Sequence, residues 1–278
     1  MTNTRVFAPA KINLALHVTG QRADGYHVLD SLVAFADVGD QVVAAPAAGA
    51  GSSLSVTGAF APEIPDGADN LVLRAAEASG VPMDLTLDKR LPPASGIGGG
   101  SADAAATLRA ALRLGGAPIA RERVLALGAD VPVCLASKPA RMRGIGDDIT
   151  PLSLPPLHMV LVNPRLPVST PAVFARLAQK ENAPMPDDLP GWPDGLSLVD
   201  WLSLQRNDLQ MPAVKEVPEI AAVLTALALT DGALLTRMSG SGATCFALFE
   251  SRPHADAAAA RLAEGNPWWW VKSASTMP

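Results

Sequence analysis

The most informative part of the chain is Pro92-Pro93-Ala94-Ser95-Gly96-Ile97-Gly98-Gly99-Gly100-Ser101, which opens into an alanine-rich helical pattern over Ala102 to Leu114. Glycines carry no side chain, so this backbone can come within hydrogen-bonding distance of an anion. The helix that follows points its first free N–H groups, and the positive end of its dipole, at the same place. The stretch therefore predicts a phosphate-binding loop. The alternative is a turn that only lets the helix pack closely on a strand, and four glycines in five residues at a helix start favour the loop.

Two common phosphate loops are excluded by the same residues. A Walker A loop requires Gly-Lys-Ser/Thr at its end, and no lysine follows here. A dinucleotide-binding turn requires a third glycine, where this chain has Ser101. The lysine of a nucleotide site must then come from elsewhere in the chain.

Composition narrows the class of protein. The chain has 278 residues, enough for one large domain or two modest ones, and 49% of them are hydrophobic. The net charge of −5 argues against a nucleic-acid partner. Cys134 and Cys245 have no metal-site or disulfide spacing, which is typical of a reducing cytoplasm. We expect no signal peptide, because the N-terminus has no basic start followed by an apolar segment. We expect no membrane span either, because the stretch nearest to the required length, 220–235, is interrupted by polar residues.

Periodicity predicts mixed strands and helices without regular alternation, which indicates the α+β class. Three prolines, Pro151, Pro155 and Pro156, predict a boundary that separates domains 1–153 and 154–278. A helix is expected from Asp69, as its N-cap, to Ser79. The other expected helices are 102–114, 119–127, 171–179, 198–204, 220–228 and 254–263, and the expected strands are 5–18, 26–36, 41–45, 54–57, 83–87, 159–162, 236–238, 245–249 and 268–273.

Lys11 and Asp130 are charged residues in apolar surroundings. Lys11 is either solvent-facing on an edge strand or held beside an anion, and Asn13 lies on its side of the strand because side chains two apart point the same way. Asp130, in Gly128-Ala129-Asp130-Val131-Pro132, is either the N-cap of a helix that starts at Val131 or a partly buried acid or base. The cap is the simpler interpretation, and the two roles are compatible.

Two further segments have a structural and a functional interpretation. Tyr26, the only tyrosine, is followed by His27, and the pair is either a half-buried aromatic beside a surface histidine or a stacking platform for a planar base. The second glycine run, Ser239-Gly240-Ser241-Gly242-Ala243-Thr244, is either a hairpin turn or a further source of backbone amides for a phosphate. We assign the tryptophans at 268–270 to the core.

Together these segments resemble the GHMP kinases. The resemblance rests on Ala8-Pro9-Ala10-Lys11-Ile12-Asn13-Leu14, on Gly25-Tyr26-His27, on the 92–102 loop, on 128–132 and on 239–244, in this order over nearly the whole chain. The Pro-Ala-Lys-Ile-Asn start and the Gly-Tyr-His triplet separate the chain from homoserine and mevalonate kinases. They are similar to the members that phosphorylate 4-diphosphocytidyl-2-C-methyl-D-erythritol.

The resemblance implies a two-domain GHMP kinase fold with the active cleft between the domains. Its N-terminal, ATP-binding domain would be ribosomal protein S5 domain 2-like, and its C-terminal domain ferredoxin-like. The implied reaction is ATP-dependent phosphorylation of the substrate's 2-hydroxyl in the non-mevalonate isoprenoid pathway. Mg²⁺ is expected with ATP, but the sequence does not identify its protein ligands, and Ser101 is only a suggestion. By position, Lys11 and Asp130 would be the catalytic pair. The ATP phosphates would bind the loop formed by Pro92, Pro93, Ala94, Ser95, Gly96, Ile97, Gly98, Gly99, Gly100, Ser101 and Ala102.

The resemblance also implies the substrate contacts. Tyr26 and His27 would hold the cytosine, Phe174 would close on the base from the other side, and Asn13 and Thr170 would reach the polar part of the substrate. Ala94 and Ser95 stand where many relatives have glycine or alanine, which the loop tolerates if both keep a negative φ. Two other functions explain these residues less well. If the chain were a different small-molecule kinase of the family, Tyr26, His27 and Phe174 would have no base to hold. If it were a nucleotide-binding regulator without catalysis, it would not need both Lys11 and Asp130, and both are present.

Overall fold

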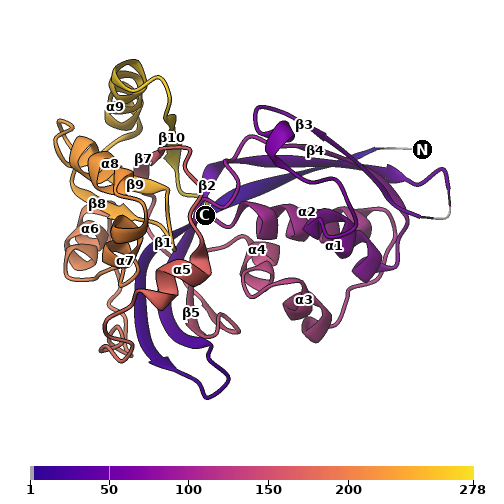
Figure 1. Ribbon diagram of the computed structural model, residues 1–278, viewed down its shortest axis with the longest axis horizontal. Helices are drawn as coiled ribbons and strands as arrows, with labels where there is room; N and C mark the ends of the chain where they lie inside the picture. The colour runs from indigo at the N-terminus through magenta and orange to yellow at the C-terminus, as the bar shows by residue number, and fades with distance from the viewer. Residues whose placement is uncertain (1–2, 50) are drawn as a thin grey trace. The chain divides into compact units, whose positions relative to one another are not determined.

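The computed structural model describes residues 3–49 and 51–278. The chain folds into two compact units, each assembled from separate stretches of sequence. Unit 1 contains the chain up to Lys11, Val38–Pro93 and Gly98–Ser137, and unit 2 contains Ile12–Asp37, Ala94–Ile97 and Lys138–Pro278. The long strands β1 (Thr4–Gln21) and β2 (His27–Pro46) pair with each other and continue from one unit into the other (Figure 1). The glycine loop also changes units, at Ala94 and again at Gly98.

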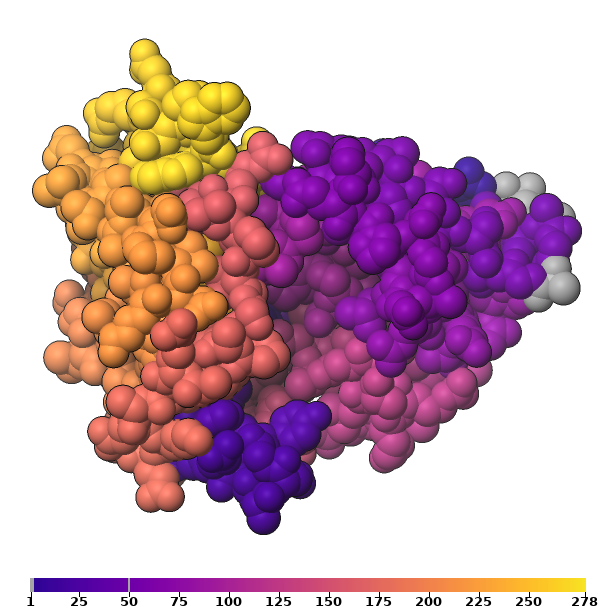
Figure 2. Space-filling view, in the orientation of Figure 1, coloured from indigo at the N-terminus to yellow at the C-terminus, as the bar shows by residue number. Residues whose placement is uncertain are grey.

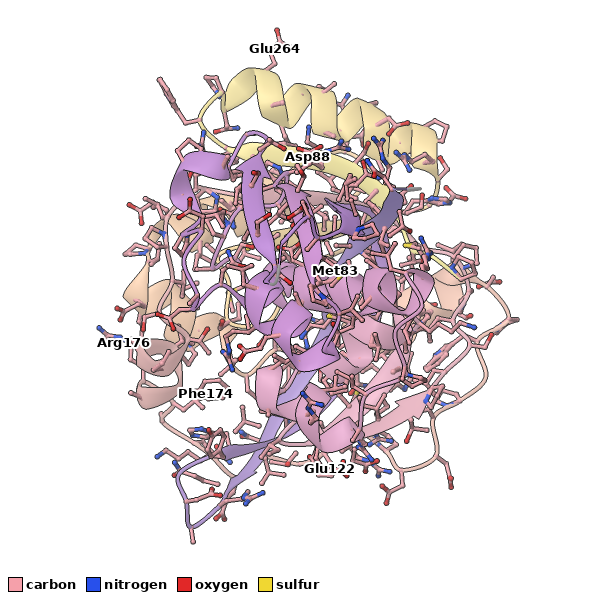
Figure 3. All side chains as sticks on the ribbon, turned by 90° about the vertical axis from the view of Figure 1, so that its right-hand side faces the viewer. Met83, Asp88, Glu122, Phe174, Arg176 and Glu264 are labelled. Atoms are coloured by element: carbon pink, nitrogen blue, oxygen red, sulfur yellow. The ribbon has the colours of Figure 1, made fainter. Side chains whose placement is uncertain are left out.

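Unit 1 consists of a sheet and a helical layer. Strand β4 (Met83–Asp88) lies between β3 (Ser53–Thr57), to which it is parallel, and residues 41–46 of β2, to which it is antiparallel. Figure 3 labels Met83 and Asp88, which begin and end β4. The alternation of buried and half-buried residues along β4 is that of a strand with one apolar face. The helices are α1 (Leu71–Ser79), α2 (Gly99–Arg113), α3 (Arg121–Leu127) and α4 (Val131–Ala136), with the short 3-10 turn η1 (Ala61–Glu63).

Helix α1 begins one residue later than the sequence predicts. Asn70, not Asp69, is its N-cap, and the Asn70 side chain accepts a hydrogen bond from the Val72 amide at 2.8 Å. Both residue types cap helices well, so the choice between neighbours depends on which one has extended backbone dihedrals. Val72, Ala75 and Ala76 form the buried stripe, as expected, and α1 packs along α2 (Figure 1).

Helix α2 begins three residues earlier than predicted, so that Gly99, Gly100 and Ser101 form its first turn. The glycines therefore belong to the helix N-terminus and not only to a loop before it. Its alanines from Ala102 to Ala106 are buried together with Asp103, which makes the helix a central element of unit 1. The expectation that Ala94 keeps a negative φ is wrong: its φ is 47°, in the left-handed region that favours glycine.

Unit 2 contains a second, antiparallel sheet with the order β10-β7-β9-β8. Its strands follow a β-α-β-β-α-β sequence, which is the ferredoxin-like arrangement expected for this part of the chain. The strands are β7 (His158–Asn163), β8 (Leu235–Met238), β9 (Cys245–Phe249) and β10 (Trp270–Ser275). The helices are α5 (Thr170–Ala175), α6 (Gly195–Ser203), α7 (Gln210–Glu216), α8 (Glu219–Ala228) and α9 (Arg252–Gly265). A hairpin of β5 (Ala140–Gly144) and β6 (Asp148–Pro151) extends residues 29–33 of β2.

Several elements of unit 2 differ from the prediction. Helix α7 and the β5–β6 hairpin are additional to the predicted elements, and α5 ends at Ala175 instead of continuing to residue 179. The assignment of all three tryptophans to the core is wrong for Trp268, which is 83% exposed, whereas Trp270 is buried in β10. In the described part of the chain, no helix combines the length and the hydropathy needed to cross a membrane.

Residues 185–187 of the proline-rich segment 182–195 are held by a buried ion pair. Arg141 on β5 donates to both carboxylate oxygens of Asp30, at 2.8 and 2.7 Å. The same guanidinium donates to the carbonyl oxygens of Met185, Pro186 and Asp187, and Asp30 accepts from the Met185 amide. A bidentate pair of this kind fixes a segment that has no regular hydrogen bonds of its own.

Candidate active site

The charged pair expected in unit 1 is present. Lys11 Nζ lies 2.6 Å from Asp130 Oδ2, and the side chains of the two residues are 5% and 35% exposed. The interpretation of Lys11 as an exposed edge residue is therefore wrong. Asp130 occupies the N-cap position of α4, as the sequence indicates, but its side chain makes no capping hydrogen bond. Its carboxylate faces the lysine instead, and because it is one-third exposed a second molecule can reach it.

The start of α2 lies against this pair. Gly98, which precedes the helix, has a φ of 64°, and a Cβ atom there would lie 3.2 Å from Cβ of Lys11. A side chain at position 98 would thus be strained and crowded by the lysine. No side chain caps α2, so its first N–H groups are not taken by a capping residue and can receive an anion. Unit 1 by itself brings together a lysine, a reachable carboxylate and a helix N-terminus.

The two glycine loops meet in unit 2. Gly96 has a φ of 74°, and a Cβ atom there would lie 2.4 Å from the carbonyl oxygen of Ser239. The Ser239 hydroxyl donates to the Gly96 carbonyl at 3.0 Å and accepts from the backbone N–H of Asn13 at 3.0 Å. The Ser95 carbonyl accepts from the Thr244 amide at 3.1 Å. The second loop connects β8 and β9, so the hairpin interpretation is correct, and it also supports the first loop.

Asn13 has an unused acceptor. Its side-chain amide is buried, with 4% exposure, and its Nδ2 donates to Ser31 at 2.7 Å, while Ser31 in turn donates to the Ala15 carbonyl. Within the described residues its Oδ1 has no hydrogen-bond partner. A buried acceptor without a partner costs free energy, which a hydroxyl or amino group of a ligand would recover.

The aromatic residues expected at a base-binding site lie in unit 2. The His27 ring stacks on Phe174 of α5, with ring centroids 4.6 Å apart and planes inclined by 25° (Figure 3 labels Phe174). Burial, followed by the charge of Lys180, lowers the pKa of His27, so the ring is neutral near pH 7. Tyr26 is 64% exposed at the turn between β1 and β2. Figure 2 shows this turn in indigo beside the salmon segment around residue 180, where Lys180 donates to Gln21. A base between the His27 and Phe174 rings would have to separate them, whereas the exposed Tyr26 ring is open to stacking.

Thr170 and Ser241 are a pair of hydroxyl groups 2.8 Å apart that link the start of α5 to the second glycine loop. Ser239, Ser241 and Ser31 are functional candidates that the sequence did not single out. The signal for the first two is their place in a glycine run, but Ser31 lies in an ordinary strand pattern and only its contact with Asn13 reveals it.

Neither cysteine is a candidate catalytic residue. Burial is the main reason that the pKa of Cys134 is raised to about 12, with the nearby Asp130 carboxylate as the next contribution, and burial also raises the pKa of Cys245. Both thiols are therefore protonated and unreactive near neutral pH. Among residues 3–49 and 51–278, no three His, Cys, Asp or Glu side chains gather as a metal site.

Comparisons with known proteins identify the family of the chain. The family model of the GHMP kinases N terminal domain matches residues 70–152, and that of the GHMP kinases C terminal matches residues 196–267. The chain belongs to the GHMP kinase family, and it is a small-molecule kinase by its fold and its relatives. The boundary at residues 153 and 154 falls between the two matches and stays a prediction.

The similar curated proteins identify a branch of the family. The chain is 57% identical over 275 residues to 4-diphosphocytidyl-2-C-methyl-D-erythritol kinase of Cereibacter sphaeroides, with 98% of each chain covered. It is 56% identical to the enzyme of the same name from Paracoccus denitrificans, with 99% of this chain and 97% of the relative covered. The crystal structure of a 4-(cytidine 5'-diphospho)-2C-methyl-D-erythritol kinase matches with a TM-score of 0.80 and 33% identity, over 99% of this chain and 100% of that one.

Proposed function

We propose that this protein transfers the γ-phosphoryl group of ATP to the 2-hydroxyl of 4-diphosphocytidyl-2-C-methyl-D-erythritol. The products are the 2-phosphate and ADP, in the non-mevalonate pathway to isoprenoid precursors. The observation that carries the proposal is the Lys11–Asp130 contact of 2.6 Å, in which a buried ammonium holds a reachable carboxylate next to an uncapped helix N-terminus. The names of the relatives supply the substrate.

Asp130 acts as the base in this proposal. Its carboxylate accepts the proton of the substrate's 2-hydroxyl as the oxygen attacks the γ-phosphorus, a contribution typically worth ~10²–10⁴-fold in rate. Lys11 holds the carboxylate of Asp130 in place and stabilises the negative charge that develops on the phosphoryl oxygens. Phosphoryl transfer requires positioning and charge stabilisation above all, which two fixed charges supply.

The glycine loop from Pro92 to Ala102 binds the ATP phosphates through the N–H groups of the first turn of α2. Mg²⁺ is the proposed ion, and it neutralises phosphate charge when bound. The Ser101 hydroxyl, in the first turn of α2, is an oxygen donor of the kind that Mg²⁺ takes, and we propose it as a ligand for the ion.

The cytidylyl part of the substrate is assigned to unit 2. Tyr26 stacks on the cytosine, His27 and Phe174 form the aromatic wall, and the free Oδ1 of Asn13 accepts from a substrate hydroxyl, with Thr170 beside it. A neutral His27 ring retains one acceptor nitrogen, which suits recognition of an exocyclic amino group. The two free, buried cysteines support the proposal of a cytoplasmic location.

One assay tests the activity. Purified protein is incubated with ATP, Mg²⁺ and 4-diphosphocytidyl-2-C-methyl-D-erythritol, ADP release is followed continuously, and phosphorus NMR locates the new phosphate. We expect ADP release that depends on the cytidylyl substrate and a phosphate at the 2-position. Homoserine and mevalonate are the matched alternatives. A higher kcat/KM with either of them, or no ADP release above the ATP-only rate, would contradict the proposal.

A further inference from the structure

Three buried charges meet beneath the first turn of α2. Lys89, the residue after β4, places its Nζ 2.6 Å from Asp40 Oδ2 and 2.6 Å from Asp103 Oδ2. The three residues are between 0% and 3% exposed. Asp40 comes from β2, Lys89 follows β4, and Asp103 lies on α2, so the cluster joins the sheet of unit 1 to the helix that the glycine loop opens.

The Asp40 side of the cluster is fully bonded. Oδ1 of Asp40 accepts from the backbone amides of Arg90 and Leu91, at 2.6 and 2.8 Å, and Oδ2 accepts from Lys89. The Lys89 amide donates to the Thr57 carbonyl. These bonds fix the position of the ammonium against the sheet, whereas the bond to Asp103 ties it to α2.

The ammonium also lies close to the start of α2. A Cβ atom at Gly99, the first residue of α2, would lie 3.1 Å from Lys89 Nζ and 3.7 Å from Asp40 Oδ2. A side chain at position 99 would therefore require the ammonium to shift by a few tenths of an ångström.

We propose that Lys89 is a positioning residue for ATP, which acts through Asp103 and Gly99. Its ammonium sets the height and direction of the first turn of α2, and hence of the N–H groups that receive the phosphates. The inference rests on the proposed role of the glycine loop. A shift of a few tenths of an ångström in those donors weakens several hydrogen bonds to one anion at once.

Two substitutions at position 103 separate the hydrogen bond from the charge. Asp103→Asn removes the charge, but its amide oxygen can still accept from Lys89, and its NH₂ can donate to Asp40 as a protonated Asp103 would. Asp103→Leu also removes the charge and has no acceptor. Both variants leave the Lys89–Asp40 pair in place, with Asp40 bonded to two backbone amides.

The test is the dissociation constant for ATP, measured by titration calorimetry without the second substrate, together with KM for each substrate. We expect Asp103→Leu to weaken ATP binding at least tenfold, and Asp103→Asn to stay within about threefold of the wild type. KM for the cytidylyl substrate should change less than twofold in both. Equal weakening in the two variants, or ATP affinity within twofold of the wild type in a folded Asp103→Leu protein, would overturn the proposal.

Gly99→Ala is the second probe, for use if Asp103→Leu does not fold. The substitution favours the helix, since alanine has a higher helix propensity than glycine, yet it places a methyl group against Lys89 Nζ. Gly100→Ala adds the same methyl in the same turn, against Leu71 at 3.6 Å, and measures the effect of a methyl alone. Gly99→Ala should weaken ATP binding at least fivefold more than Gly100→Ala; equal effects would contradict the role of Lys89. A wild-type protein that binds ATP but does not phosphorylate the cytidylyl substrate would refute the proposed function and leave this inference standing.

Discussion

Asp130 combines two properties: its ion-pair partner, Lys11, is buried, and its own side chain is partly exposed. Asp40 and Asp103 are each at most 3% exposed and cannot meet a substrate, whereas the Asp130 side chain is 35% exposed while Lys11 holds one of its oxygens. The lysine fixes the carboxylate in place without covering it. A residue that must accept a proton from a bound hydroxyl needs both properties.

The first prediction concerns Asp130→Asn. The amide keeps the size of the side chain and its contact with Lys11 but cannot accept a proton, so kcat should fall by about 10²–10⁴-fold. KM for ATP should change by less than about threefold, because the glycine loop is intact. Steady-state ADP release measures both constants. A kcat within threefold of the wild-type value would remove Asp130 from the role of base.

The second prediction concerns Tyr26→Ala. The exposed ring has little packing to lose, so the protein should fold normally. Loss of one stacking partner should raise KM for the cytidylyl substrate by about 5–30-fold, which corresponds to ~1–2 kcal/mol. The ATP dissociation constant should be unchanged, because no proposed ATP contact involves this residue. If both substrates are affected equally, stacking on Tyr26 is not the cause.

At the scale of single elements, capping distinguishes two neighbouring residues that the sequence alone does not. Asn70 caps α1 through the Val72 amide and also donates to the Pro65 carbonyl at 2.6 Å. Asp69, directly before it, is exposed and is not the capping residue. The pattern of a polar residue before an apolar stripe is satisfied by both.

The third prediction compares these two positions. Asn70→Ala should lower the free energy of unfolding by about 1 kcal/mol, since a helix N-cap contributes roughly 0.5–2 kcal/mol. Asp69→Ala is the matched control and should change it by less than about 0.5 kcal/mol. Urea unfolding followed by circular dichroism gives both values. A larger decrease in unfolding free energy for Asp69→Ala than for Asn70→Ala would mean that Asp69 is the cap, as the sequence suggested.

At the scale of the whole molecule, the buried cluster makes folding depend on pH. Burial is the main reason that the pKa of Asp103 is raised to about 7; the Asp40 carboxylate adds to the shift and Lys89 opposes it. Burial by itself would lower the pKa of Lys89, but the carboxylates of Asp103 and Asp40 outweigh it and the pKa is raised. The lysine therefore stays charged. Cys134 on α4 also senses Asp103, and its thiol stays protonated in this range.

The fourth prediction is a loss of stability with rising pH. An unfolded aspartate has a pKa near 3.9, so between about pH 4 and 7 the folded state binds a proton that the unfolded state has released. The stabilisation from protonated Asp103 is complete below about pH 4 and is lost as pH rises through about 7. Asp103→Asn lacks this titration. The unfolding free energy of the variant minus that of the wild type should therefore be larger at pH 8 than at pH 5, by an amount on the order of 2 kcal/mol. The same difference at both pH values in urea unfolding would mean that Asp103 does not titrate in this range.

Much of the fold follows from local pattern. The strands of β4, β7 and β9 and the helices α1, α2 and α8 match their expected ranges within three residues, because each has an apolar period that only one kind of element satisfies. The short β5–β6 hairpin and α7 could not be predicted, since brief elements take their stability from neighbouring strands and helices that are distant in sequence.

The kinase family follows from the sequence, because glycine runs, Pro-Ala-Lys-Ile-Asn and Gly-Tyr-His are backbone and side-chain requirements written in consecutive residues. The sequence also placed Asp130 at the start of a helix, and the resemblance paired it with Lys11. The folded chain adds that the carboxylate contacts Lys11, 119 residues away, and makes no capping hydrogen bond. The cluster of Asp40, Lys89 and Asp103 near Gly99 could not be read from the sequence at all. A buried charge is tolerated only beside its counter-charge, and packing, not proximity in the chain, selects that partner.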